Sequence, residues 1–103
     1  MQKIVALAAV CCLCACASTS NSVRGNSAAD EVLKTDTYRM FSAIAAAKMK
    51  CEKIDYAEVT ASEVTNQIAS ETWVAHGCGK SLPYAVTFVP SLAGGYSYQI
   101  RLQ

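Results

Sequence analysis

Six cysteines and a single histidine are the residues of this chain whose chemistry could define a site. Four of the cysteines lie in one short apolar stretch near the N-terminus: Cys11, Cys12, Cys14 and Cys16. Thiolates are good zinc ligands, but metal-binding cysteines normally come as spaced pairs in polar loops, with further cysteine or histidine ligands elsewhere. The sequence offers no second cluster of this kind. The stretch therefore favours a role in export over metal binding.

The same stretch has the proportions of a secretory leader. Lys3 supplies one positive charge, and residues 4–17 are uncharged and mostly apolar. A membrane-spanning helix needs about 20 such residues, so this run is too short. Its end, Leu13-Cys14-Ala15-Cys16, resembles the lipobox of bacterial lipoproteins, in which a branched apolar residue, a tolerant position and a small residue precede the acylated cysteine.

This resemblance implies that residues 1–15 are a signal peptide and that Cys16 carries a lipid anchor. In lipoproteins of this type the thiol receives a diacylglyceryl group. Two or three acyl chains anchor a protein stably, because each buried CH₂ contributes about 0.8 kcal/mol. Ala17, in place of aspartate, implies delivery to the outer membrane by the sorting rule of these lipoproteins, with the domain facing the periplasm. The alternative is a cleaved signal peptide without a lipid.

Cys51 and Cys78 remain once the leader and Cys16 are set aside. An even pair in an exported chain predicts one disulfide bond, because the compartments outside the cytoplasm are oxidising. Closing a loop of about 28 residues would stabilise the domain by about 3.5 kcal/mol. A redox-active pair is disfavoured, since the spacing is not Cys-x-x-Cys.

Residues 16–27 are predicted to be the lipidated cysteine and a flexible tether, and residues 28–103 to form one small domain. The first element of the domain is predicted to be a helix, and the sequence allows two positions for its start. Ser27 begins a Ser-x-x-Asp capping box, and Asp36 is a second candidate cap. Side chains that recur at steps of three and four predict the buried face, which Phe41 widens: Leu33, Thr37, Met40, Ile44, Ala47 and Cys51.

Strands are predicted over residues 71–76, 84–89 and 96–101, where β-branched and aromatic residues are frequent between Gly- and Pro-containing connections. Residues 53–59 predict a further strand with imperfect alternation. For residues 60–70 we favour a turn or short helical piece followed by extended chain. Short connections imply antiparallel neighbours. The predicted fold class is therefore α+β, with one N-terminal helix packed on a small antiparallel β-meander of three to four strands and one disulfide.

The segment WVAHGCGKSLPYAVTF, together with the cysteine that ends the predicted helix, resembles a group of uncharacterised small proteobacterial envelope lipoproteins. These share a Trp…Gly-Cys-Gly…Tyr-x-Val core. The likeness covers about residues 43–89. It implies this fold and an envelope location, and it brings no known activity.

His76 could act as a base toward Cys78 only if that thiol were free. A metal site would need several further ligands, and Glu58, Glu63 and Glu71 show no ligand spacing. We therefore predict no catalytic residue, no metal and no cofactor.

Four aromatic residues on the strands could form a binding surface, but packing in the core or in cross-strand pairs is favoured: Trp73, Tyr84, Tyr96 and Tyr98.

Charge excludes one class of partner. Without Lys3 the chain keeps eight of its nine basic side chains against eight acidic ones, so it lacks the basic surface that nucleic acid binding requires. The predicted partners are the membrane, through the lipid anchor, and an envelope protein. The predicted function is a non-enzymatic binding or accessory role in a periplasmic or outer-membrane assembly.

The alternative function is a periplasmic inhibitor of a cell-wall hydrolase, similar to the lipid-anchored lysozyme inhibitors. Those families carry a Ser-Gly-x-x-Tyr type of loop. The segment Gly94-Gly95-Tyr96-Ser97-Tyr98 loosely resembles it, although the order of the residues differs.

Overall fold

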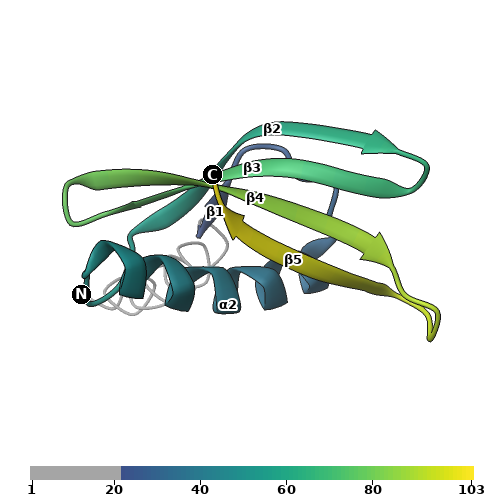
Figure 1. Ribbon diagram of the computed structural model, residues 1–103, viewed down its shortest axis with the longest axis horizontal. Helices are drawn as coiled ribbons and strands as arrows, with labels where there is room; N and C mark the ends of the chain where they lie inside the picture. Colours follow the sequence, from purple (N-terminus) through teal and green to yellow (C-terminus); the bar gives the residue numbers. More distant parts are fainter. Residues whose placement is uncertain (1–21) are drawn as a thin grey trace, which may run out of the picture.

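The structure, a computed structural model, describes residues 22–103. The predicted leader and the predicted acylation of Cys16 lie outside these residues. One helix, α2 (Glu31–Met49), covers one face of a five-stranded sheet (Figure 1). The strands lie side by side in chain order: β1 (Val23–Arg24), β2 (Tyr56–Thr65), β3 (Ile68–Gly77), β4 (Lys80–Pro90) and β5 (Tyr96–Leu102). The predicted α+β class is confirmed.

The sheet has five strands, not the three to four predicted. The additional strand, β1, falls in the segment predicted as tether. It pairs with β2 in parallel, with Val23 opposite Ala57 and Arg24 opposite Glu58. A two-residue strand is invisible to periodicity, because alternation needs about four positions to be recognised. The other neighbouring strands are antiparallel, as predicted.

Helix α2 begins at neither of the two predicted caps. Asp30 is the N-cap, and its carboxylate accepts a hydrogen bond from the backbone N–H of Leu33 at 2.9 Å. Ser27 lies upstream of the helix, and Asp36 lies within it. The helix ends at Met49, and its C-cap Lys50 adopts the left-handed backbone conformation with φ of 55°. Cys51 therefore follows the helix and does not belong to its buried face.

The buried face of α2 differs from the predicted one. Phe41 is fully buried and makes edge-to-face contacts with Trp73 and Tyr84, with ring centroids 5.3 and 5.2 Å apart. Met40 and Ile44, predicted to be buried, are 50% and 38% exposed. One residue turns a helix by about 100°, so centring the face on bulky Phe41 moves Met40 to its margin. The buried residues of α2 are Thr37, Phe41, Ala45, Ala46 and Met49.

Strand β2 is longer than predicted, and the short helical piece predicted within residues 60–70 is wrong. The strand continues to Thr65, and a two-residue turn of Asn66 and Gln67, with φ of 53° and 68°, leads into β3. The pairing with β3 shifts between Val59 and Ala61. This bulge adds one residue and so reverses the facing of the residues that follow it. The imperfect alternation over residues 53–59 has another cause: Ile54 lies before the strand, and Tyr56 faces away from α2 while Ala57 and Val59 are buried.

The three C-terminal strands are confirmed as β3, β4 and β5. Tyr84, Val86 and Phe88 are buried on one face of β4, as their alternation predicts. Strand β4 begins earlier than predicted, at Lys80, because Cys78 and Gly79 form a tight turn with φ of 52° and 71°.

The predicted disulfide between Cys51 and Cys78 is present, with the two Cα atoms 6.1 Å apart. It joins the chain just after α2 to the turn between β3 and β4. The neighbouring Gly77 packs against Ile54, where a Cβ atom would lie 2.8 Å from the Ile54 Cα. The bond therefore holds the C-terminal end of the helix to this end of the sheet.

Candidate binding groove

The structure brings some of the residues considered for chemistry together: Cys51 is bonded to Cys78, and His76 lies beside Glu58. Both Cys51 and Cys78 are consumed by the disulfide, so neither thiol is free to act with His76. Trp73 and Tyr84 are core residues, whereas Tyr96 is half-exposed. Within residues 22–103 no group of three or more His, Cys, Asp or Glu side chains could hold a metal ion. The same residues include no helix long and apolar enough to cross a membrane.

His76 belongs to a column of side chains on the sheet face away from α2. Its ring stacks on Tyr56 with centroids 4.6 Å apart, and its Nε2 lies 3.0 Å from the Glu58 carboxylate. The Arg24 guanidinium lies 3.7 Å from the Tyr56 ring centroid. The column links β1, β2 and β3. Sequence reasoning missed it because it depends on the register that sets Tyr56 opposite His76.

Glu71 forms the main polar network of the helix-facing side. It is 4% exposed, and its carboxylate accepts hydrogen bonds from four donors. The Oε1 atom accepts from the Ser27 hydroxyl and the Trp73 indole N–H, both at 2.8 Å. The Oε2 atom accepts from the Ala28 backbone N–H at 2.6 Å and the Ser62 hydroxyl at 2.8 Å. These bonds satisfy a carboxylate that would otherwise be costly to bury.

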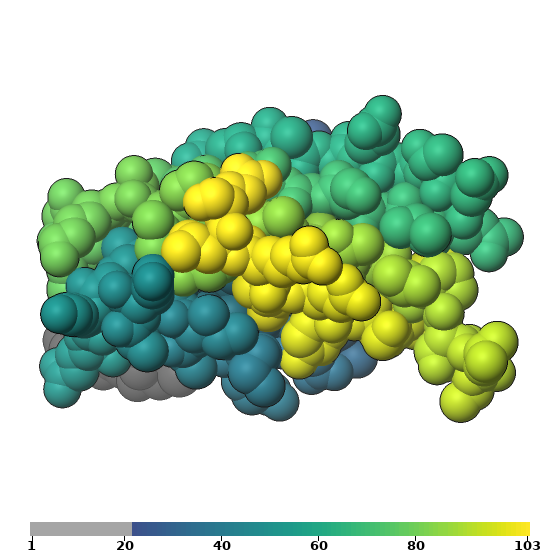
Figure 2. All heavy atoms as spheres, viewed as in Figure 1, coloured from purple at the N-terminus to yellow at the C-terminus, as the bar shows by residue number. Residues whose placement is uncertain are grey.

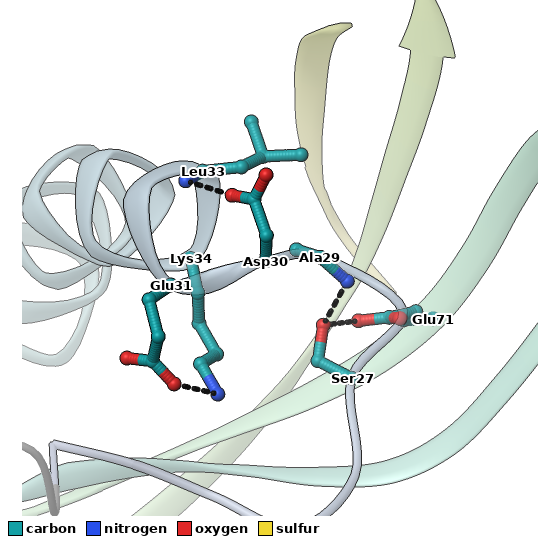
Figure 3. A network of polar contacts seen from close by, with 7 residues as sticks. All are labelled: Ser27, Ala29, Asp30, Glu31, Leu33, Lys34 and Glu71. Atoms are coloured by element: carbon teal, nitrogen blue, oxygen red, sulfur yellow. Dashed lines mark hydrogen bonds and ion pairs between the residues drawn. The ribbon is translucent and has the colours of Figure 1, made fainter.

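The network fixes the chain where it approaches α2. The Ser27 hydroxyl donates to Glu71 and also accepts from the Ala29 backbone N–H at 3.1 Å (Figure 3). Asp30 then caps the helix at the next position. The sequence held one signal for this arrangement, since Glu71 and Trp73 are two apart on a strand and therefore share a face. Residues 27–30 consequently form a wall that these hydrogen bonds hold beside the sheet.

A groove lies next to this wall, at the N-terminal end of α2. The hairpins β2–β3 and β4–β5 extend past this end of the helix (Figure 1). The groove has a volume of about 370 Å³, within the range of about 300–1,000 Å³ usual for ligand sites. Val64 and Tyr96, at its mouth, are 58% and 50% exposed. The lining is mostly apolar: Ala28, Ala29, Asp30, Leu33, Val64, Gln67, Ala69, Phe88 and Tyr96.

The β2 bulge helps to build the groove. Val59 faces the helix before the bulge, and Ser62 and Val64 face the same way after it, opposite Glu71 and Ala69. Without the extra residue, Val64 would point to the other face of the sheet. The Asp30 carboxylate already caps α2, and Gln67 and Tyr96 contribute the other polar side-chain groups to a lining that is otherwise apolar. The groove is therefore suited to an apolar group, such as an aliphatic or aromatic side chain.

Comparisons with protein families, with curated proteins and with solved structures found no match for this chain. The resemblance to small envelope lipoproteins thus stays a prediction from the motifs in the sequence.

Proposed function

We propose that the chain is a lipid-anchored protein of the bacterial envelope with a non-enzymatic binding role. Cys16 would carry the anchor, and the domain would face the periplasm from the outer membrane. The lipobox-like segment Leu13-Cys14-Ala15-Cys16 supports the anchor. The bond between Cys51 and Cys78 supports export, because structural disulfides persist mainly in oxidising compartments.

The groove at the N-terminal end of α2 is the main structural support for the proposed binding role. Its walls are preformed, because the Glu71 network and the N-cap hold residues 27–30 in place. Val64 and Tyr96 leave apolar surface exposed at its mouth. Preformed apolar surface binds with little loss of conformational entropy. We infer that the groove receives an apolar side chain from an extended segment of an envelope protein.

The neighbouring edge of β2 supports an extended partner. Strand β1 pairs only with Ala57 and Glu58, so within residues 22–103 no strand covers the outer edge of β2 beyond them. A peptide that paired with this edge could place a side chain in the groove near Val64. Backbone pairing supplies affinity in this mode of recognition, and the pocket supplies specificity.

The test is a pull-down from solubilised membranes with the full-length lipidated chain. We expect the wild-type chain to recover an envelope protein and Val64→Asp to lose it, because the new charge would be desolvated in an apolar groove. Val32→Asp is the matched control, since Val32 is exposed on α2 and lies outside the groove. Under conditions that recover a known lipoprotein complex, equal recovery by Val64→Asp, or no partner for wild type, would contradict the proposal.

An inhibitor of a cell-wall hydrolase is a second candidate function, favoured by the loop between β4 and β5. This loop projects from the domain (Figure 1), and Leu92 within it is fully exposed. A projecting apolar residue is suited to insertion into the cleft of an enzyme. We would expect inhibition of lysozyme by the wild-type chain and weaker inhibition by Leu92→Ser. Unchanged lysozyme activity at micromolar concentrations of the protein would exclude this candidate.

A further inference from the structure

The outer edge of β5 is regular and open. The strand pairs with β4 from Tyr96 to Leu102 without a shift in register. No other strand within residues 22–103 pairs with its second edge. Its sequence, YSYQIRL, contains neither proline nor lysine, which commonly keep edge strands from pairing with another chain. Strand β5 can therefore accept an added strand.

The side of α2 next to this edge presents half-exposed apolar side chains at its centre, between charged residues. Met40 and Tyr98 line one shallow hollow of the α2–β5 seam, and Ile44 and Ile100 line the next. Figure 2 shows β5, in yellow, directly beside the blue and teal surface of α2. Side chains of successive strands on one face of a sheet are neighbours. A strand added to β5 would thus lay its helix-facing side chains over Met40 and Ile44.

We propose that the added strand is β5 of a second copy of this chain, paired antiparallel about a two-fold axis through Gln99. This register sets Tyr98 opposite Ile100 of the second copy on the helix-facing side. Pairs of an aromatic and a β-branched side chain are among the favourable cross-strand pairs. Each such pair occurs twice, as a two-fold interface requires.

The charges along α2 fit the same axis. Asp36, Met40, Ile44 and Lys48 recur at steps of four, so they lie along one side of the helix. Their midpoint falls between Met40 and Ile44. A two-fold rotation about this midpoint turns Asp36 of each copy toward Lys48 of the other. The contact of Asp36 with Arg39, at 3.7 Å, is an exposed pair that contributes little and does not oppose this arrangement.

The midpoints of the strand and of the helix coincide. Met40 adjoins Tyr98, and Ile44 adjoins Ile100, so the centre of the helix stripe lies beside Gln99. A single axis therefore satisfies both the strand pairing and the charge pattern of α2. This agreement favours a second copy over an unrelated strand, which would have to match both features independently. The proposal depends neither on the lipid anchor nor on the groove at Val64.

Cysteine cross-linking of the full-length chain tests the register. Residues on the axis face their own copies, at Cα distances of about 4.5–5.5 Å, within reach of a disulfide. We expect Gln99→Cys, treated with a mild oxidant that takes up the two thiol hydrogens, to give a covalent dimer that a reductant dissolves. Ser97→Cys is the matched control. It is exposed on the same face, but its two copies would lie about 13 Å apart along the strands, so we expect no dimer from it.

A second substitution tests the part played by α2. Ile44→Asp, added to Gln99→Cys, should abolish the cross-linked dimer, whereas Val32→Asp should leave it intact. Circular dichroism checks that each variant is folded. The proposal is overturned if Gln99→Cys stays monomeric, if Ser97→Cys cross-links equally, or if Ile44→Asp has no effect. A cross-link from Gln99→Cys to a different protein in intact membranes, in place of the self-dimer, would also overturn it.

Discussion

The buried carboxylate of Glu71 accepts a hydrogen bond from the indole N–H of Trp73 at 2.8 Å, two residues along the same strand. The bond lets both polar groups lie beneath the helix without exposure to water. It also makes Glu71 the point where β3, β2 and the approach to α2 meet. The groove beside this point therefore depends on a residue that does not line it.

We predict that Glu71→Gln lowers the free energy of unfolding by about 2–3 kcal/mol. Glutamine has one acceptor oxygen where the carboxylate has two, so buried donors lose their partner. Urea denaturation of the variant and the wild type measures the difference. Glu63→Gln, on an exposed position of β2, is the control and should change stability by less than about 0.5 kcal/mol. Equal stability of Glu71→Gln and wild type would mean that the network contributes nothing.

Loss of the disulfide should destabilise the domain by about 3.5 kcal/mol, because the unfolded chain gains the freedom of the opened loop. The double variant Cys51→Ala and Cys78→Ala, compared with the oxidised wild type in urea, gives this difference. In the presence of a reductant the wild type should approach the stability of the variant. Mass spectrometry of a non-reduced digest should contain the peptide that links Cys51 to Cys78. Alkylation of both Cys51 and Cys78 in the folded protein would contradict the structure.

Tyr84→Phe should leave stability unchanged or raise it by about 1 kcal/mol. Among the described residues, the Tyr84 hydroxyl is buried without a hydrogen-bond partner. Removing a polar group that lacks a partner removes its cost of desolvation. Thermal or urea unfolding at neutral pH measures the effect. A loss of more than about 1 kcal/mol would indicate that the hydroxyl has a partner in solution.

The burial of Tyr84 also predicts that the stability of the domain falls at alkaline pH. Burial raises the pKa of Tyr84 above its ordinary value of 10.0, and burial, together with the nearby charge of Asp55, does the same for the pKa of Tyr38. The folded state therefore holds these protons more tightly than the unfolded state. Their contribution to stability is complete below pH 10 and is lost as pH rises through the folded-state pKa values. Tyr84→Phe should reduce this alkaline loss, as urea titrations above and below pH 10 would measure.

If the proposed lipid anchor is correct, Cys16→Ser should abolish incorporation of radiolabelled palmitate, since the variant lacks the thiol at the position that the lipobox resemblance assigns to acylation. Cys14→Ser is the control and should still be labelled, because only the tolerant position of the motif changes. Labelling of Cys16→Ser would assign the anchor to another cysteine. The measurement is fluorography of the immunoprecipitated full-length chain.

The sequence by itself determined the parts of the fold that local pattern controls. Tyr84, Val86 and Phe88 alternate with less buried residues, so the strand could be predicted without knowing which strands lie beside it. The disulfide followed from counting, because only Cys51 and Cys78 remained after the N-terminal cluster was assigned to export. These inferences needed only residues close together in the chain, or residue types that have one obvious partner.

The tertiary structure decided whatever depends on contacts between distant residues. Phe41 sets the buried face of α2 because its ring packs edge-to-face against Trp73 and Tyr84 of the sheet. This orientation leaves Met40 and Ile44 at the seam with β5. The bulge after Val59 reversed the facing of β2 and made both the Glu71 network and the groove. Helical and strand periods specify which residues can share a face. Which face is buried is set by the free energy of packing against the rest of the chain, and a local pattern does not contain it.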